Sequence, residues 1–170
     1  MKRFVRRAVV TAALVAVPTL AAAPAFATAS AETPRKASAV DQAAYETEVV
    51  KLTNAERTAR GCTALRVDDR LVASARAHSA DMARTATMSH TGSDGSNFVT
   101  REVRAGYPRK DAAAENIAYG YRTPQQVVTA WMNSTGHRKN ILNCASKAIG
   151  VGLVRTSGGT AYWTQNFGRA

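Results

Sequence analysis

Several familiar catalytic signatures are absent from this 170-residue sequence. It has no His-Glu-x-x-His zinc motif, no Gly-x-Ser-x-Gly nucleophile turn, no Gly-rich phosphate loop and no paired Cys-x-x-Cys. It also contains only two cysteines and three histidines. Any catalytic or metal site must therefore be assembled from residues that lie far apart in the chain.

Long apolar runs are also missing, with one exception near the N-terminus. That run covers about residues 8–23, follows four basic residues and precedes the small-residue sequence at 25–27. This order predicts a secretory signal peptide over residues 1–27, although a second small-residue site at 29–31 leaves the cleavage position open. The run is short and contains Pro18, so we expect a secreted protein with no membrane span after signal removal.

Clustered basic sequence is absent too, because no run of five basic residues occurs. The formal charge of +11 includes four basic residues and no acidic ones in residues 1–27, so it falls to +7 without them. A basic surface favours anionic partners such as cell-wall polymers or lipid head groups, but a solvated Arg-rich surface is the interpretation that we favour. Scattered charges give no support for a nucleic-acid partner.

The two cysteines, Cys62 and Cys144, both lie in the part predicted to be exported. Exported chains with two cysteines usually pair them, so we expect a disulfide that closes a long loop. A catalytic cysteine is the alternative.

Hydrophobic periodicity and turn signals predict helices first and a β-hairpin last. We expect a flexible lead-in over residues 28–40 and one folded domain over 41–170. Its elements are helices at about 41–60, 69–85, 97–105, from 124 to a break at 134–136, and 138–142, with strands at 115–119, 148–156 and 160–167. Helices must cover both faces of so small a sheet, which predicts an α+β fold as a three-layer α-β-α sandwich.

Two helix starts carry clear capping signals. Asp68 precedes the second helix as a candidate N-cap. At the fourth helix, Thr123 is the candidate N-cap, Pro124 takes the first helical position, and Gln126 stands where its side chain can reach back.

Three residues stand out as candidates for chemistry. His90 lies at the head of a polar loop, and His137 follows the helix break, where it could equally be a capping or surface residue. Glu115 begins a predicted strand, and its carboxylate must be paired, hydrogen-bonded or metal-bound to stay ionised. His78 continues the apolar stripe of the second helix, so we interpret it as a hydrogen-bonded core residue. Two imidazoles and a carboxylate are ligand types for a divalent ion, but their spacing gives no local signature.

Taken in order, seven short stretches resemble the bacterial branch of the CAP superfamily, or SCP domains. This superfamily includes cysteine-rich secretory proteins, venom antigens and plant pathogenesis-related proteins. The stretches are Leu52–Arg57, Ala77–Met82, Ser89–Thr91, Ala114–Ala118, Trp131–Arg138, Gly150–Gly152 and Tyr162–Gly168.

The resemblance implies an α-β-α sandwich with a central cleft of two histidines and acidic residues. His90 and His137 match the histidines, which in many relatives hold a divalent ion, often zinc, and Glu115 matches the first carboxylate. Animal and plant relatives carry a second glutamate at the position that is Ser134 here. Its loss weakens a transferred acid–base mechanism, and we expect Ser134 to cap the following short helix instead.

Function is left open by this resemblance because the fold hosts several functions. Our first hypothesis is a secreted, monomeric, non-enzymatic module that binds lipid, sterol-like or cell-envelope ligands, with a divalent-metal cleft. The alternative is a zinc-dependent hydrolase or peptidase, in which His90 and His137 hold the ion and Glu115 is the general base. A third hypothesis is a stress- or spore-associated envelope protein without a small ligand.

Overall fold

The computed structural model describes residues 34–170. The expected signal peptide lies outside these residues, as do residues 28–33 of the expected lead-in. The chain order is α1 (Pro34–Thr58), β1 (Arg66–Val67), α2 (Asp69–Thr85), α3 (Phe98–Arg104), the 3₁₀ turn η1 (Arg109–Asp111), β2 (Ala112–Tyr119), α4 (Pro124–Asn133), α5 (Thr135–Ile141), β3 (Ala148–Arg155) and β4 (Ala161–Gly168). The expectation of a flexible segment up to residue 40 is wrong from Pro34 onward, because α1 already begins there.

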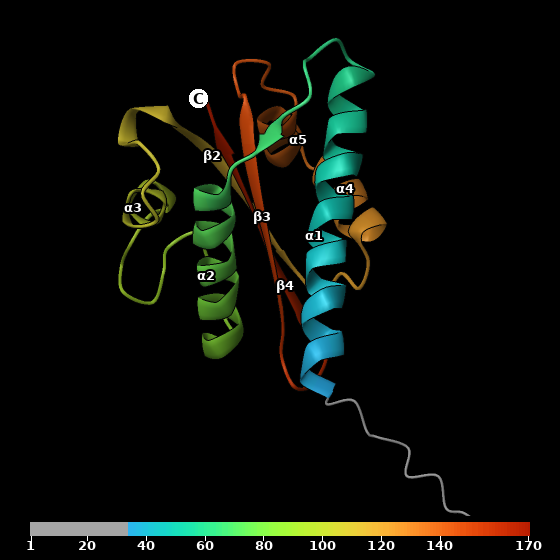
Figure 1. Cartoon of the computed structure of the whole chain (residues 1–170), viewed down its shortest axis with the longest axis vertical. Helices are drawn as coiled ribbons and strands as arrows, with labels where there is room; N and C mark the ends of the chain where they lie inside the picture. The colour runs from blue at the N-terminus through green and yellow to red at the C-terminus, as the bar shows by residue number, and fades with distance from the viewer. Residues whose placement is uncertain (1–33) are drawn as a thin grey trace, which may run out of the picture. The chain divides into compact units, whose positions relative to one another are not determined.

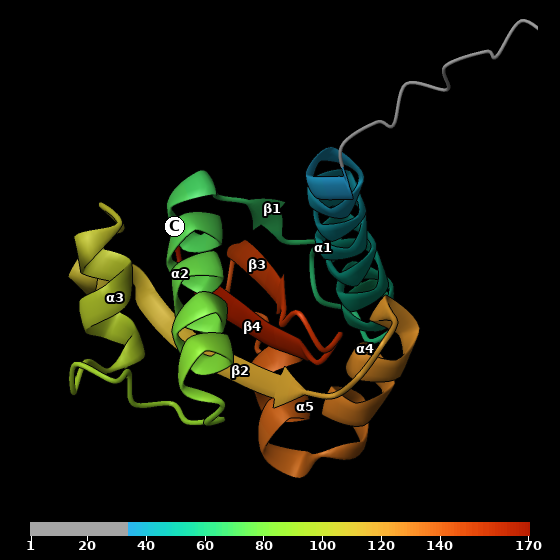
Figure 2. The ribbon, with the colours of Figure 1, turned by 90° about the horizontal axis from the view of Figure 1, so that it is seen from below.

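The sheet has four strands in the order β1-β3-β4-β2. The short β1, which the sequence did not predict, is parallel to β3, and β4 runs antiparallel to both β3 and β2. Helices α2 and α3 lie on one side of the sheet, while α1 and α4 lie on the other and α5 lies beside β2 (Figures 1 and 2). The predicted three-layer sandwich with a C-terminal hairpin is confirmed, and β2 is the edge strand that borders the candidate site.

Strand β4 is central, and every one of its residues is buried because helices cover both faces of the sheet. Its polar side chains find partners in these helices. Gln165 donates to the hydroxyl of Thr53 on α1 at 2.8 Å, and Ser79 on α2 donates to the hydroxyl of Thr164 at 2.9 Å. These bonds satisfy polar groups that would otherwise destabilise the core.

Helix α2 lies directly on β3 because two glycines leave space for its backbone. A Cβ added at Gly150 would come within 2.1 Å of the Leu71 carbonyl carbon, and one at Gly152 within 2.3 Å of that of Ala75. The alternation of glycine with apolar residues in β3 therefore sets the separation between helix and sheet.

The predicted caps are confirmed at two helices. The Asp68 side chain accepts from the Arg70 amide at α2, and the Thr123 hydroxyl accepts from the Gln126 amide at α4. Gln126 reaches back as expected, although its side-chain oxygen accepts from the amide of Arg122, one residue before the cap, at 2.9 Å.

The two cysteines form the expected disulfide, which joins positions separated by 82 residues. Arg57, at the end of α1, is fully buried beside this cross-link. Its guanidinium donates to the carbonyl oxygens of Thr63, Ile141, Asn143 and Ser146. The disulfide and Arg57 together attach α1 to the segment between α5 and β3.

Candidate functional site

A histidine and a glutamate meet at the free edge of the sheet. Glu115 lies near the start of β2, and His90 lies in the loop after α2. The His90 Nδ1 lies 2.8 Å from the Glu115 Oε1, with the glutamate side chain 1% exposed and the histidine side chain 57% exposed. Because an ionised carboxylate only accepts, Nδ1 is the donor, and Nε2 is the ring nitrogen left for another partner.

Arg101 holds both members of this pair in place. From α3, its Nη2 donates to the Glu115 Oε2 at 2.7 Å, while its Nη1 donates to the carbonyl oxygens of His90 and Ser96 at 3.1 and 2.7 Å. The Arg101 side chain is only 9% exposed, so its charge compensates the buried carboxylate of Glu115. Sequence patterns carry no sign of this role, because Arg101 is one of many scattered arginines.

His78 supports the loop that carries His90. It is 1% exposed on α2, and its Nε2 lies 2.9 Å from the carbonyl oxygen of Ser89. Burial lowers the pKa of His78, which keeps the ring neutral at physiological pH. The structure therefore agrees with the core interpretation of His78, and it adds that this histidine fixes the residue just before His90.

His137 approaches the site from α5, on the other side of β2. The Asn116 side chain donates to the His137 carbonyl oxygen at 3.2 Å, and the Asn140 side chain donates to the Asn116 side chain at 2.8 Å and to the Glu115 carbonyl oxygen at 3.3 Å. Burial lowers the pKa of His137, and the nearby charge of His90 lowers it further.

A cavity of about 410 Å³ opens at this place, lined in part by His90, Glu115, Asn140 and Phe98. Among residues 34–170, no three His, Cys, Asp or Glu side chains are grouped to hold a metal ion. The two imidazoles nevertheless have suitable donor chemistry, since His137 is favoured in its neutral form and His90 is oriented by a carboxylate as metal-binding histidines are. In this arrangement the carboxylate of Glu115 orients the His90 ring, and both of its oxygens already have hydrogen-bond partners.

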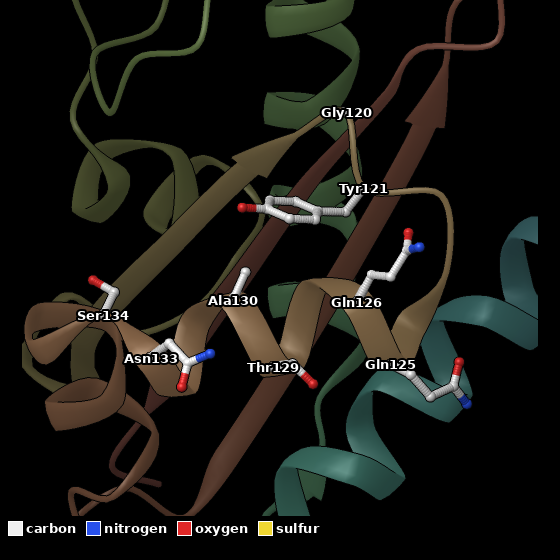
Figure 3. A pocket seen from close by; sticks show the side chains of 8 residues that line it. All are labelled: Gly120, Tyr121, Gln125, Gln126, Thr129, Ala130, Asn133 and Ser134. Carbon is white, nitrogen blue, oxygen red and sulfur yellow. The ribbon is translucent and has the colours of Figure 1, made fainter.

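Ser134 lies at the junction between α4 and α5, where the family's second glutamate would be expected. It occupies the N-cap position of α5, but its side chain makes no capping hydrogen bond, so that expectation is wrong. Ser134 instead lines a second hollow beside α4 (Figure 3).

Glu102 is an acidic residue that the sequence did not single out. It is fully buried on α3, and neither carboxyl oxygen has a hydrogen-bond partner in the described part of the chain. Burial raises the pKa of Glu102 to about 8, the charge of Glu115 adds to this rise, and the charge of Arg101 opposes it. Glu102 is therefore largely protonated at neutral pH.

The sequence profile of the cysteine-rich secretory protein family (CAP) matches residues 50–167. The chain belongs to the CAP family. It is 47% identical over 126 residues to the uncharacterized protein YkwD of Bacillus subtilis, which covers 73% of this chain and 47% of that protein. It is also 35% identical over 126 residues to the uncharacterized membrane protein YlbC of the same organism. That match covers 74% of this chain and 35% of YlbC. The chain thus spans about half the length, or less, of these CAP relatives.

Solved CAP structures agree with this assignment. An extracellular protein with an SCP domain from Bacillus anthracis matches with a TM-score of 0.73 and 30% identity, covering 81% of this chain and 44% of that one. An outer surface protein of Borrelia burgdorferi matches with a TM-score of 0.64 over 71% of this chain and 89% of that one, and at 23% identity it supports the fold alone. None of the helices in the part of this CAP chain that the structure describes is long and apolar enough to cross a membrane.

Proposed function

We propose that this CAP protein is an extracellular, non-catalytic binding module for a component of the cell envelope, with a divalent-metal site formed by His90 and His137. The observation that carries the non-catalytic part is the state of Glu115. Its two carboxyl oxygens are engaged by His90 and by Arg101, and its side chain is 1% exposed. A general base needs an oxygen that can reach a water molecule, and both oxygens of Glu115 already have partners.

The metal part of the proposal is supported by the donor set. His90 keeps Nε2 free while Nδ1 is held by Glu115, and the lowered pKa of His137 favours the neutral ring that metal ligation requires. A bound divalent ion would supply a positive centre for an oxygen of the ligand. Glu115 and Arg101 would keep the His90 ring in place.

The envelope part of the proposal is supported by the kind of structural neighbour found. The structural neighbour that is 30% identical is described as an extracellular protein. The hollow between α1 and α2, lined by several valines, has about 240 Å³, below the roughly 300–1,000 Å³ of common ligand sites. This hollow therefore gives no support for a lipid or sterol ligand.

The first experiment titrates zinc into the purified protein by calorimetry, beside a His90→Ala/His137→Ala double variant and a Glu115→Gln variant. We expect one zinc per chain, no binding by the double variant, and binding weakened by about 10–100-fold in Glu115→Gln, since it loses the group that orients His90. Glu56→Gln makes the same change on α1, outside the cleft, and is expected to bind as the wild type does.

Circular dichroism of each variant establishes that it is folded. Absence of zinc binding by the folded wild type would overturn the metal site, as would unchanged binding by the double variant. Zinc-dependent peptide hydrolysis that disappears in Glu115→Ala would overturn the non-catalytic assignment and support the hydrolase.

A further inference from the structure

A second and larger hollow, of about 820 Å³, lies between the segment after β2 and helix α4. Its lining residues, shown in Figure 3, are Gly120, Tyr121, Gln125, Gln126, Thr129, Ala130, Asn133 and Ser134. The ring of Tyr121 extends above α4, toward the side on which Ser134 lies (Figure 3). We call this hollow the α4 groove.

The α4 groove is lined without a single charged side chain, although the chain carries a formal charge of +11. Its polar groups are the amides of two glutamines and an asparagine and the hydroxyls of a threonine, a serine and a tyrosine. Amides both donate and accept hydrogen bonds, and so do hydroxyls. This chemistry fits a neutral ligand that is rich in hydroxyl or acetamido groups and offers nothing to pair with an ionic ligand.

The groups that line the α4 groove are available for binding. Gln125, Thr129 and Asn133 are exposed, and their side chains make no hydrogen bond within residues 34–170. Tyr121 is 38% exposed and is one of few large hydrophobic side chains on the described surface. An exposed aromatic ring beside free amides offers one flat apolar face and several polar partners.

The backbone that carries Tyr121 is already fixed. The Trp163 indole Nε1 donates to the Tyr121 carbonyl oxygen at 2.9 Å, and the Gly120 amide donates to the Ala161 carbonyl oxygen at 2.8 Å. The Gln126 side chain holds the amide of Arg122. Since these bonds order the segment before any ligand arrives, binding loses little conformational entropy.

We propose that the α4 groove binds an uncharged oligosaccharide, with one sugar ring stacked on Tyr121 and its hydroxyl or acetamido groups bonded to Gln125, Thr129 and Asn133. Pyranose rings present an apolar face of C–H groups and a rim of hydroxyls, which is the pattern that the groove complements. At its other end, Ser134 lies one helical turn before His137. A longer chain would therefore extend toward the histidine cleft.

This inference rests on the proposed envelope-binding function and names the chemical class of its ligand. Its test is an amide NMR titration of the purified protein in the presence of EDTA, with tetramers of N-acetylglucosamine and of glucose as probes. We expect shifts of the Gln125 and Asn133 side-chain amides and of the Trp163 indole proton, which lies behind Tyr121. The open groove covers one face of the sugar, so dissociation constants should be roughly 0.1–1 mM.

Matched tyrosine variants distinguish binding in the groove from surface adsorption. Tyr121→Ala should weaken binding about tenfold or more, while Tyr121→Phe, which keeps the ring, should change it little. Tyr119→Ala removes another exposed tyrosine, one that stacks on Tyr162 and does not line the groove, and should have no effect.

Absence of shifts up to the solubility limit of both sugars would overturn the inference, as would equal binding by Tyr121→Ala. Shifts caused only by an acidic polysaccharide or only by a glutamine-rich peptide would overturn it too. Because EDTA keeps the histidine cleft free of metal, these results are independent of the zinc titration.

Discussion

The buried carboxyl of Glu102 makes the stability of the protein depend on pH in a specific direction. Burial raises its pKa from an ordinary value of 4.5 to about 8 in the folded chain. A carboxyl whose folded pKa is raised binds more protons in the folded state than in the unfolded state between these two values. Its contribution to stability is therefore complete below pH 4.5 and is lost as the pH rises through 8.

The size of this effect follows from the pKa difference. Each unit of difference corresponds to about 1.4 kcal/mol, so the free energy of unfolding should fall by about 2–3 kcal/mol between pH 5 and pH 7 through Glu102 alone. Glu102→Gln has nearly the same shape and does not titrate. The difference in free energy of unfolding between the variant and the wild type should therefore shift by that amount in favour of the variant.

Urea unfolding at pH 5, 6, 7 and 8, followed by tryptophan fluorescence with the disulfide intact, measures this difference. The absolute stability of Glu102→Gln does not matter, because only the change with pH tests the reasoning. Glu56→Gln, on α1, should follow the wild-type pH dependence. Parallel curves for Glu102→Gln and the wild type would refute a buried, protonated carboxyl at this position.

Three further predictions concern stability and are checked by denaturant unfolding. Arg57→Ala should lower the free energy of unfolding by about 3–5 kcal/mol, because it leaves four carbonyl oxygens without their buried donor, and a loss below about 1 kcal/mol would contradict this role. Gly152→Ala should lower the free energy of unfolding by about 3 kcal/mol or more, because the added Cβ meets the backbone of α2. Gly61→Ala should lower it by less, because the only obstacle there is the positive φ. Reducing the disulfide, which joins positions separated by 82 residues, should lower the free energy of unfolding by about 4 kcal/mol in the chain-entropy description. An unchanged denaturant midpoint after reduction would contradict this prediction.

Local signals in the sequence predicted most helices and strands of this fold. The second helix has the predicted bounds, Asp69–Thr85, because its N-cap and apolar stripe are both encoded within a few residues. The start of α1 at Pro34 was missed, since the Ala- and Ser-rich segment there carries no apolar periodicity. The two-residue β1 was missed because its pairing with β3 depends on a distant part of the chain.

The candidate site, like the fold, was predicted only in part from the sequence. Residue types and family motifs selected His90, His137 and Glu115, and the structure brings His90 into contact with Glu115. Nothing in the sequence selected Arg101 or Glu102, whose properties come from burial beside the Glu115 carboxylate.

Residue patterns alone predicted the family, most of the local elements and the caps of α2 and α4, because each of these depends on neighbours within a few positions. Three properties emerged only in the folded chain: both oxygens of Glu115 are occupied, Glu102 lacks a partner within the described residues, and an uncharged groove opens beside α4. These properties escape the sequence because hydrogen bonding, desolvation and cavity shape depend on which distant segments meet at the edge of the sheet.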